Sequence, residues 1–133
     1  MGQQQLLLIV LGVIIVGIAV VVGINLFNAN AETSTQDSIV SQGTNIGALA
    51  QQYYKKPVSM GGGGGAFDHS KGGVGFQTYF NTLPNKLITS TDATWAVTEV
   101  TPTQVTLTAT PVDYNWTVVT TVTDSTIVSS VNN

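Results

Sequence analysis

A long run of hydrophobic residues lies close to the N-terminus of the chain. The stretch from Leu6 to Phe27 reads LLLIVLGVIIVGIAVVVGINLF, and Asn25 is its only polar residue. A helix of this length spans about 33 Å, which is close to the roughly 30 Å of a bilayer's hydrocarbon core. Because the run is apolar on every side, it lacks the one-sided pattern of a surface helix in a soluble domain. The pattern predicts a helix that is surrounded by lipid or by other protein.

A second pattern follows, in which apolar or small residues recur at helical spacing. Lys55 and Lys56 suit a helix C-terminus, and Pro57 cannot continue the helix. We therefore predict one helix over residues 1–56, apolar over 6–27 and amphipathic over 28–56. The apolar or small positions of the second part are Val40, Gly43, Ile46, Gly47, Ala50, Tyr53 and Tyr54, and the opposite face carries Gln36, Gln42, Asn45, Gln51 and Gln52.

A helix of this size raises the question of what covers it. It would be about 80 Å long, which one small domain cannot bury by itself. The simplest partner is another copy of the same chain. Two pairs of small residues, Ala19 with Gly23 and Gly43 with Gly47, have the spacing that lets helix backbones approach closely. Glycine is also frequent in membrane helices generally, so this packing role stays an expectation.

Glycine is concentrated after the helix, where eight of the fifteen residues from Gly61 to Gly75 are glycine. A phosphate-binding loop is not indicated, because the lysine of this run is followed by glycine and no strand precedes it. Residues 57–86 are predicted to form a Gly-rich connection that either moves freely or packs against a neighbour. The apolar residues expected to anchor it are Phe76, Tyr79, Phe80 and Leu83.

Apolar and polar residues alternate with a period of two in the C-terminal part of the chain. Turn signals around Pro102, Pro111 and Asp124 divide this part into four short segments. Short connections favour an antiparallel meander. We predict a four-stranded antiparallel β domain over residues 87–133.

One face of this sheet is apolar and needs a cover, and the amphipathic half of the helix is the available one. The predicted fold class is therefore α+β, with a long N-terminal helix and a small C-terminal antiparallel sheet packed on the second half of that helix. The residues expected in the helix–sheet core are Ile46, Ala50, Tyr53, Trp95, Val97, Val105, Leu107, Trp116 and Val118.

Composition narrows the function classes. Only 8% of the residues are charged, the net charge is −3, and arginine is absent, so nucleic acid is not an expected partner. The chain has no cysteine and one histidine, which excludes a thiolate metal site or a histidine cluster within one copy. Asp68, His69 and Ser70 are consecutive, whereas catalytic triads converge from separate positions. We expect no enzyme activity, no cofactor and no metal.

Three interpretations of the apolar segment compete. Ala29-Asn30-Ala31 resembles the cleavage site of a secretory signal, but the run is longer than the roughly 7–15 residues of such a signal. A permanent membrane anchor that carries an external β-rich binding domain is the second interpretation. The third is a helix that waits in the membrane and then enters the core of a filament, and this is the interpretation that we favour.

The N-terminal stretch MGQQQLLLIVLGVIIVGIAVVVGINLF, with its amphipathic extension to Lys56, resembles the type IV pilin superfamily. The resemblance implies an extracellular surface filament, or fimbrium, with roles such as cell adhesion. It further implies transient insertion in the cytoplasmic membrane, assembly machinery, and a prepilin peptidase that would cut after Gly2 and leave Gln3 first. Bacterial pilins typically carry Glu at the fifth mature position, whereas here the candidates are Gln5, Leu6 and Leu7. The chain therefore looks more like archaeal-type or divergent bacterial pilins.

The leading hypothesis is a self-assembling structural subunit, and a membrane-anchored surface protein is the alternative. A filamentous viral coat protein would need the same self-assembling helix and is not distinguished by the sequence. Asn115 begins an N-x-T sequon at the start of a predicted strand, so it is a candidate for N-glycosylation. The residues expected to pack in the filament core are Leu6, Leu7, Leu8, Val10, Leu11, Gly12, Ile14, Gly17, Ala19, Val21, Gly23, Phe27, Gly43 and Gly47.

Overall fold

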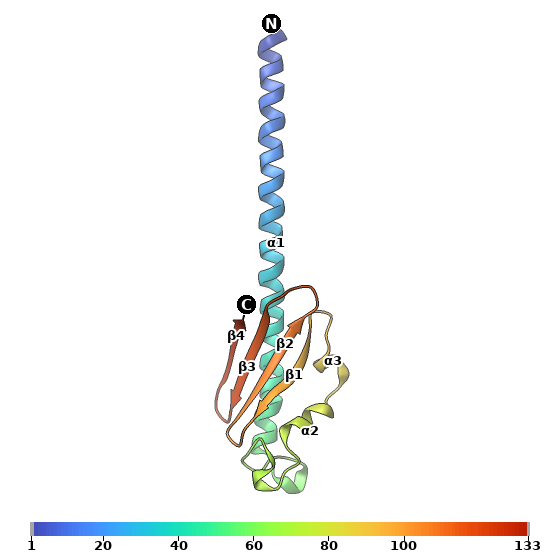
Figure 1. Cartoon of the computed structure of the whole chain (residues 1–133), viewed down its shortest axis with the longest axis vertical. Coiled ribbons are helices and arrows are strands. Elements are labelled where there is room, and N and C mark those ends of the chain that lie inside the picture. The colour runs from blue at the N-terminus through green and yellow to red at the C-terminus, as the bar shows by residue number, and fades with distance from the viewer. Residues whose placement is uncertain (1, 133) are drawn as a thin grey trace. The chain divides into compact units, whose positions relative to one another are not determined.

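The computed structural model describes residues 2–132, and its first element is a single long helix, α1, from Gly2 to Lys55 (Figure 1). The chain divides into two compact units between Thr35 and Gln36. The second unit contains the end of α1 and all the remaining elements. These are η1 (Val58–Met60), η2 (His69–Lys71), α2 (Phe76–Asn81), α3 (Asn85–Ile88), β1 (Ala93–Val100), β2 (Gln104–Pro111), β3 (Thr117–Thr123) and β4 (Ile127–Asn132).

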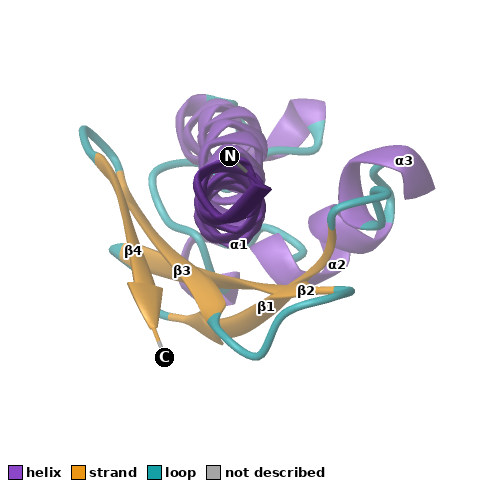
Figure 2. Cartoon of the chain, turned by 90° about the horizontal axis from the view of Figure 1, so that it is seen from above, coloured by secondary structure: helices purple, strands orange, loops and turns teal. Residues whose placement is uncertain are grey.

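The four strands form one antiparallel sheet in the order β1-β2-β3-β4. Within the second unit this sheet lies on one side of α1, and α2 and α3 lie beyond the β1 edge (Figure 2). A shift in register between Val97 and Glu99 marks a bulge in β1 at Thr98, whose hydroxyl donates to the Thr106 carbonyl at 3.1 Å. The predicted α+β class, with a small antiparallel sheet packed on the helix, is confirmed.

The core of the second unit lies between α1 and the inner face of the sheet. Burial alternates along β2 and β3, so every second residue faces the helix and the intervening positions, many of them threonine, face outward. Of the nine residues expected in this core, Val97 is partly buried against the cluster and the other eight lie inside it. The additional buried members are Ile39, Phe67, Phe76, Phe80, Ala93, Ala109 and Val122.

Gly43 and Gly47 have a different role from the one expected. Both are buried on α1 and face the sheet of their own chain. A Cβ at position 43 would lie 2.6 Å from the Trp95 ring and 2.7 Å from the Thr120 hydroxyl, and one at position 47 would lie 3.0 Å from Ile127. The expectation that these glycines pack in a filament core is therefore corrected, because the space above each one is filled by a strand.

A polar seam joins α1 to the start of β1. The Gln42 side-chain oxygen accepts hydrogen bonds from Ser90 at 3.0 Å and from the Trp95 indole at 3.3 Å. The Asp92 carboxylate accepts from Ser38 at 2.8 Å. The sequence places Gln42 on the polar face of the helix, but its side chain contacts β1 through Trp95, and its amide also reaches the Asp92 carboxylate at 3.5 Å.

The glycine run caps the end of α1. The last carbonyl groups of a helix have no partner inside the helix. Here the amide of Gly63 donates to the Tyr53 carbonyl, that of Gly64 to the Lys56 carbonyl and that of Gly65 to the Tyr54 carbonyl, at 2.8–3.0 Å. Of the two predicted alternatives, free movement or close packing, the second holds, and the packing partner is the helix of the same chain. A positive φ of 65° at Gly64 and 100° at Gly65 explains why glycine is used there.

Tyr53 connects this loop to the core. Its hydroxyl accepts a hydrogen bond from the Gly75 amide at 2.8 Å, and its ring contacts those of Phe76 and Tyr79 with centroids 5.9 Å and 5.0 Å away. Burial raises the pKa of the Tyr53 hydroxyl, the hydrogen bond from Gly75 acts in the opposite direction, and the charge of Asp68 raises it further.

The β domain begins later than predicted. The first strand starts at Ala93. The short helix α3, Asn85–Ile88, spans the predicted boundary at residue 87, so its last two residues fall in the region that was predicted to be β. Pro84 has φ −56°, and its carbonyl accepts from the Leu87 amide at 2.9 Å. The turn that follows Pro84 therefore makes the start of the predicted β region helical.

We predict that Gly43→Ala destabilises the second unit. The added methyl group forces Trp95 and Thr120 to move, which costs about 1–3 kcal/mol. That cost exceeds the gain of up to about 1 kcal/mol from replacing a helical glycine by alanine. Both tryptophans of the chain lie in this core, so unfolding of the full chain in mild detergent can be followed by tryptophan fluorescence. The exposed Ser41→Ala is the control and should change stability by less than about 0.5 kcal/mol.

We predict that Tyr53→Phe lowers stability by about 1–3 kcal/mol at neutral pH, because the Gly75 amide loses its acceptor. The folded-state pKa of Tyr53 is raised, so the neutral hydroxyl stabilises the fold below pH 10, and this contribution is lost as the pH rises through the folded-state pKa. The stability difference between wild type and variant should therefore narrow at high pH in denaturant titrations. Tyr79→Phe, whose ring contacts Tyr53, is the control, and a difference that grows with pH would contradict the assignment.

Candidate assembly surface

The apolar part of α1 has no cover in the described structure. Seventeen large hydrophobic side chains between Leu6 and Phe27 are 51–73% exposed. They occur at nearly every position, so exposed side chains surround the helix. In contrast, Ile39, Ile46, Ala50 and Tyr53, which lie on α1 beyond Thr35, are at most 1% exposed. The apolar segment is therefore the feature of this chain that most clearly requires another molecule.

Helix α1 is long enough and apolar enough to cross a membrane. Its backbone hydrogen bonds are satisfied internally, as a segment in hydrocarbon requires. Many of its residues are β-branched, which mildly disfavours a helix in water, so this stretch depends on its surroundings for stability.

Small residues interrupt the apolar surface at intervals. A Cβ built at Gly12, Gly17 or Gly23 would meet nothing within 4 Å, so the backbone at each glycine is open to an approaching helix. Ala19 and Gly23 lie four residues apart and hence on one face. Where two helices cross at such a face, their backbones can come closer than larger side chains allow.

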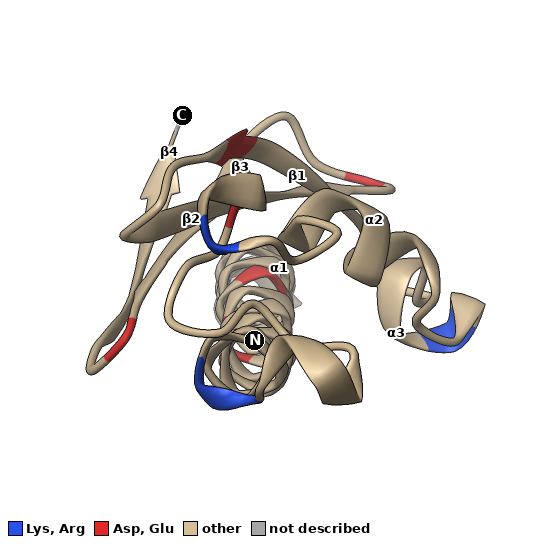
Figure 3. Ribbon diagram, turned by 90° about the horizontal axis from the view of Figure 1, so that it is seen from below, with Lys and Arg blue, Asp and Glu red and all other residues tan. Residues whose placement is uncertain are grey.

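The segment carries no side-chain charge. The first charged residue after the N-terminus is Glu32, and Gln3, Gln4 and Gln5 precede the apolar run as exposed neutral side chains. Figure 3 shows few charged positions along the described chain. Two of the four lysines are Lys55, the last residue of α1, and Lys56, which follows it. The absence of charge before residue 32 removes the largest barrier to burying this helix in an apolar surrounding.

The expected filament-core residues separate into two groups. The twelve between Leu6 and Phe27 lie on the exposed segment, where the structure gives them no packing partner among residues 2–132. Gly43 and Gly47 belong to the helix–sheet core instead. The predicted cleavage position, Gly2 before Gln3, lies inside the first turn of α1. Residues such as Gln42 were missed, since a glutamine at a helical polar position carries no sequence signal for a contact with a sheet.

No group of three or more His, Asp or Glu side chains within residues 2–132 is placed to hold a metal ion. Asp68, His69 and Ser70 form a local turn, in which the Asp68 carboxylate accepts from the Ser70 amide at 2.9 Å. Hydrogen bonds with Ser70 lower the pKa of Asp68. The His69 ring contacts the Gly73 carbonyl at 3.2 Å, so these side chains are used to shape the loop.

Comparison with protein-family models, with curated proteins and with solved structures found no match to this chain. The layout itself, a long N-terminal apolar helix and a small antiparallel sheet, is pilin-like.

We predict that Val16→Lys, near the middle of the apolar segment, weakens membrane insertion. Val16 is 61% exposed, so the substitution leaves the fold of residues 36–133 unchanged. A lysine at the centre of a membrane helix costs about 2.5–3.5 kcal/mol on insertion scales. The fraction of chain that stays with membranes after an alkaline carbonate wash should fall sharply, whereas Ser34→Lys, beyond the apolar run, should retain it. Equal retention of both variants would contradict a membrane-inserted segment.

Proposed function

We propose that the chain is a structural subunit of an extracellular filament of the type IV pilus kind, which assembles through residues 6–27 of α1. The observation that carries the proposal is that every large hydrophobic side chain of this segment is more than half exposed. If it buries on the order of 2,000 Å² of apolar surface, about 25 cal/mol per Å² corresponds to tens of kcal/mol relative to water. A chain with such a segment needs lipid or protein around it at every stage.

The proposal includes both surroundings for the segment, lipid before assembly and other subunits afterwards. The segment has the length and composition for a bilayer, so the subunit would be held in the cytoplasmic membrane before assembly. Transfer from lipid to a bundle of identical helices gains little from the hydrophobic effect, because lipid is already apolar. Helix packing at small residues such as Ala19 and Gly23 supplies the preference for protein neighbours. The transfer would also be driven by the assembly machinery that the resemblance implies.

The sheet suits an exposed position on such a filament. Threonine alternates with buried residues on the outer face of β2, at positions 106, 108 and 110. Their hydroxyl groups make this face wettable with little charge. The inner face is covered by α1 of the same chain, so the longest uncovered apolar surface is the segment that we propose as the assembly element.

A membrane-anchored surface protein is the second candidate, since the same helix satisfies its main requirement. The two candidates differ in what surrounds the helix in the mature protein. A filament can be sheared from cells as protein fibres, whereas an anchored chain stays in the lipid until detergent is added.

We predict that Gly23→Leu blocks filament formation without blocking membrane insertion. Leucine is as apolar as lipid requires, but it fills the open space above the Gly23 backbone. A loss of about 1.4 kcal/mol at one subunit contact weakens that contact about tenfold, and the loss recurs at each subunit. The measurement is electron microscopy of material sheared from cells that produce the chain, together with the amount of chain left in washed membranes.

Val22→Leu is the matched control, because it places the same leucine side chain at a neighbouring position that is already large and 51% exposed. Wild type and Val22→Leu should give long uniform fibres, and Gly23→Leu should remain in the membrane fraction. If the wild-type chain is never found in fibres and leaves the membrane only as detergent-bound monomers, the filament proposal is wrong and the anchor is favoured.

A further inference from the structure

The connection between β2 and β3 holds the N-x-T sequon, a feature that filament assembly does not use. Residues 112–116 join Pro111 at the end of β2 to Thr117 at the start of β3. The chain contains a single N-x-S/T sequence, Asn115-Trp116-Thr117. The structure shows how each of its three residues is placed.

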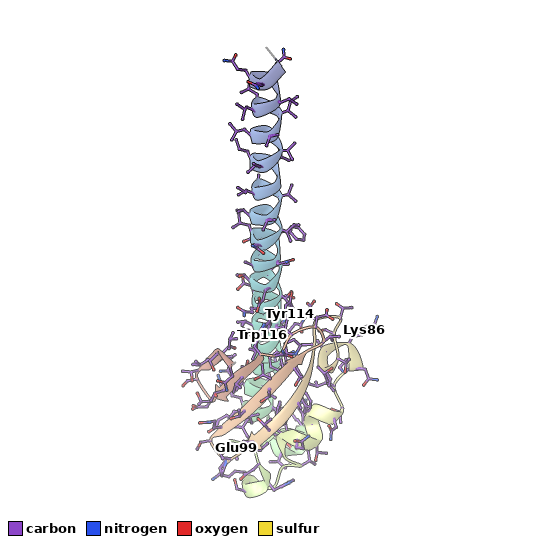
Figure 4. All side chains as sticks on the ribbon, turned by 45° about the horizontal axis from the view of Figure 1, so that its top comes forward. Lys86, Glu99, Tyr114 and Trp116 are labelled. Carbon is purple, nitrogen blue, oxygen red and sulfur yellow. The ribbon has the colours of Figure 1, made fainter. Side chains whose placement is uncertain are left out.

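The aromatic residues on either side of Asn115 face the protein. Trp116 is only 6% exposed and belongs to the buried cluster, and Tyr114 packs against that cluster. Their rings stack with centroids 5.3 Å apart and planes inclined by 20°, and Figure 4 labels both at the same end of the sheet. The amide of Val112 also donates to the Asp92 carbonyl at 3.1 Å, so the connection is held near both of its ends.

Asn115 and Thr117 are both more exposed than Trp116, which lies between them. Successive side chains of an extended strand alternate between its two sides. Thr117, the first residue of β3, lies between the buried Trp116 and Val118, so it faces outward and is half-buried. Asn115 lies in the bend just before β3 and is exposed. Among residues 2–132 no hydrogen bond involves the Asn115 side chain. The sequon thus has an exposed asparagine and a partly exposed threonine, and the intervening Trp116 is anchored in the core.

We propose that Asn115 is a site of N-linked glycosylation. In this modification the Asn115 side-chain nitrogen forms a bond to the anomeric carbon of a saccharide carried on a polyprenyl phosphate or pyrophosphate. The bond between that carbon and the phosphate oxygen breaks, the lipid phosphate leaves with the electron pair, and the amide nitrogen loses one proton to a base of the transferase. The proposal rests on the proposed function only in requiring that residues 36–133 lie outside the cytoplasm.

A saccharide would hydrate a part of the surface that has few charged side chains. A saccharide at Asn115 adds hydration at an edge where the neighbouring Val112 is 65% exposed. Because the Asn115 side chain makes no contact that folding depends on, the modification requires no rearrangement of the core.

The test is mass spectrometry of the chain purified from the surface of the cells that naturally make it. No lysine or arginine follows Lys86, so trypsin would leave residues 87–133 in one piece. A protease that cleaves before aspartate instead gives the fragment 113–123, in which Asn115 is the only asparagine. Fragmentation by electron transfer then places the added mass on one residue.

We expect a saccharide on Asn115 in the wild type and in Thr117→Ser, which keeps the sequon. Asn115→Gln and Thr117→Val should lose it, with tryptophan fluorescence showing that both variants remain folded. Asn81 and Asn85 are internal controls, since both are exposed and neither has Ser or Thr two positions later. An unmodified fragment 113–123, or a saccharide on one of its threonines that persists in Asn115→Gln, would overturn the proposal.

Electron microscopy of the same preparation separates this inference from the proposed function. Fibres whose subunits carry an unmodified Asn115 would overturn glycosylation and leave the filament standing. A glycosylated chain that is present only as detergent-dependent monomers would support the modification and overturn the filament.

Discussion

The exclusion of water from one apolar helix segment is the constraint on which the behaviour of this chain depends. Between Leu6 and Phe27 the large side chains are exposed in every direction, and a soluble monomer would have to hydrate all of them. Hydration of that much apolar surface costs far more than the roughly 5–15 kcal/mol by which domains are stable. The segment therefore determines where the chain can exist, whereas the second unit determines only what it carries there.

The C-terminal part of α1 is covered by the sheet of the same chain. There the apolar positions are restricted to one face, and glycine at 43 and 47 lets the strands approach the helix backbone. Gln42 adds specificity, because its oxygen has partners on Ser90 and Trp95 only in one placement of the sheet. The change from an all-round to a one-sided apolar pattern thus separates a surface for other molecules from a surface for the chain itself.

The sequence was sufficient for the elements that depend on periodicity. The long helix, the four antiparallel strands and the buried tryptophans follow from spacings of 3.6 and 2, which are visible in one chain. The sequence was insufficient where the same residue type fits two different structures. Glycine at 43 and 47 fits contact with another helix or with a strand, and the glycine run fits a free linker or a helix cap. Pro84 starts a helical turn, α3, that extends past the predicted start of the β domain at residue 87. Tertiary contacts decide between such alternatives, and a local sequence pattern does not identify them.

The first 31 residues have no charged side chain, so the helix that they form is compatible with lipid and with a bundle of other helices. A charged side chain buried in lipid or in a helix bundle needs a partner, and its transfer between the two breaks that pairing at a cost of several kcal/mol. With glutamine rather than glutamate at positions 3–5, and no charged residue before Glu32, no such pairing has to be made or broken. The difference between lipid and protein surroundings then falls to close packing, which only correctly aligned copies of a helix provide. In the transfer from lipid to filament that we propose, the absence of charge would remove an electrostatic barrier, and close packing at the small residues would favour the filament.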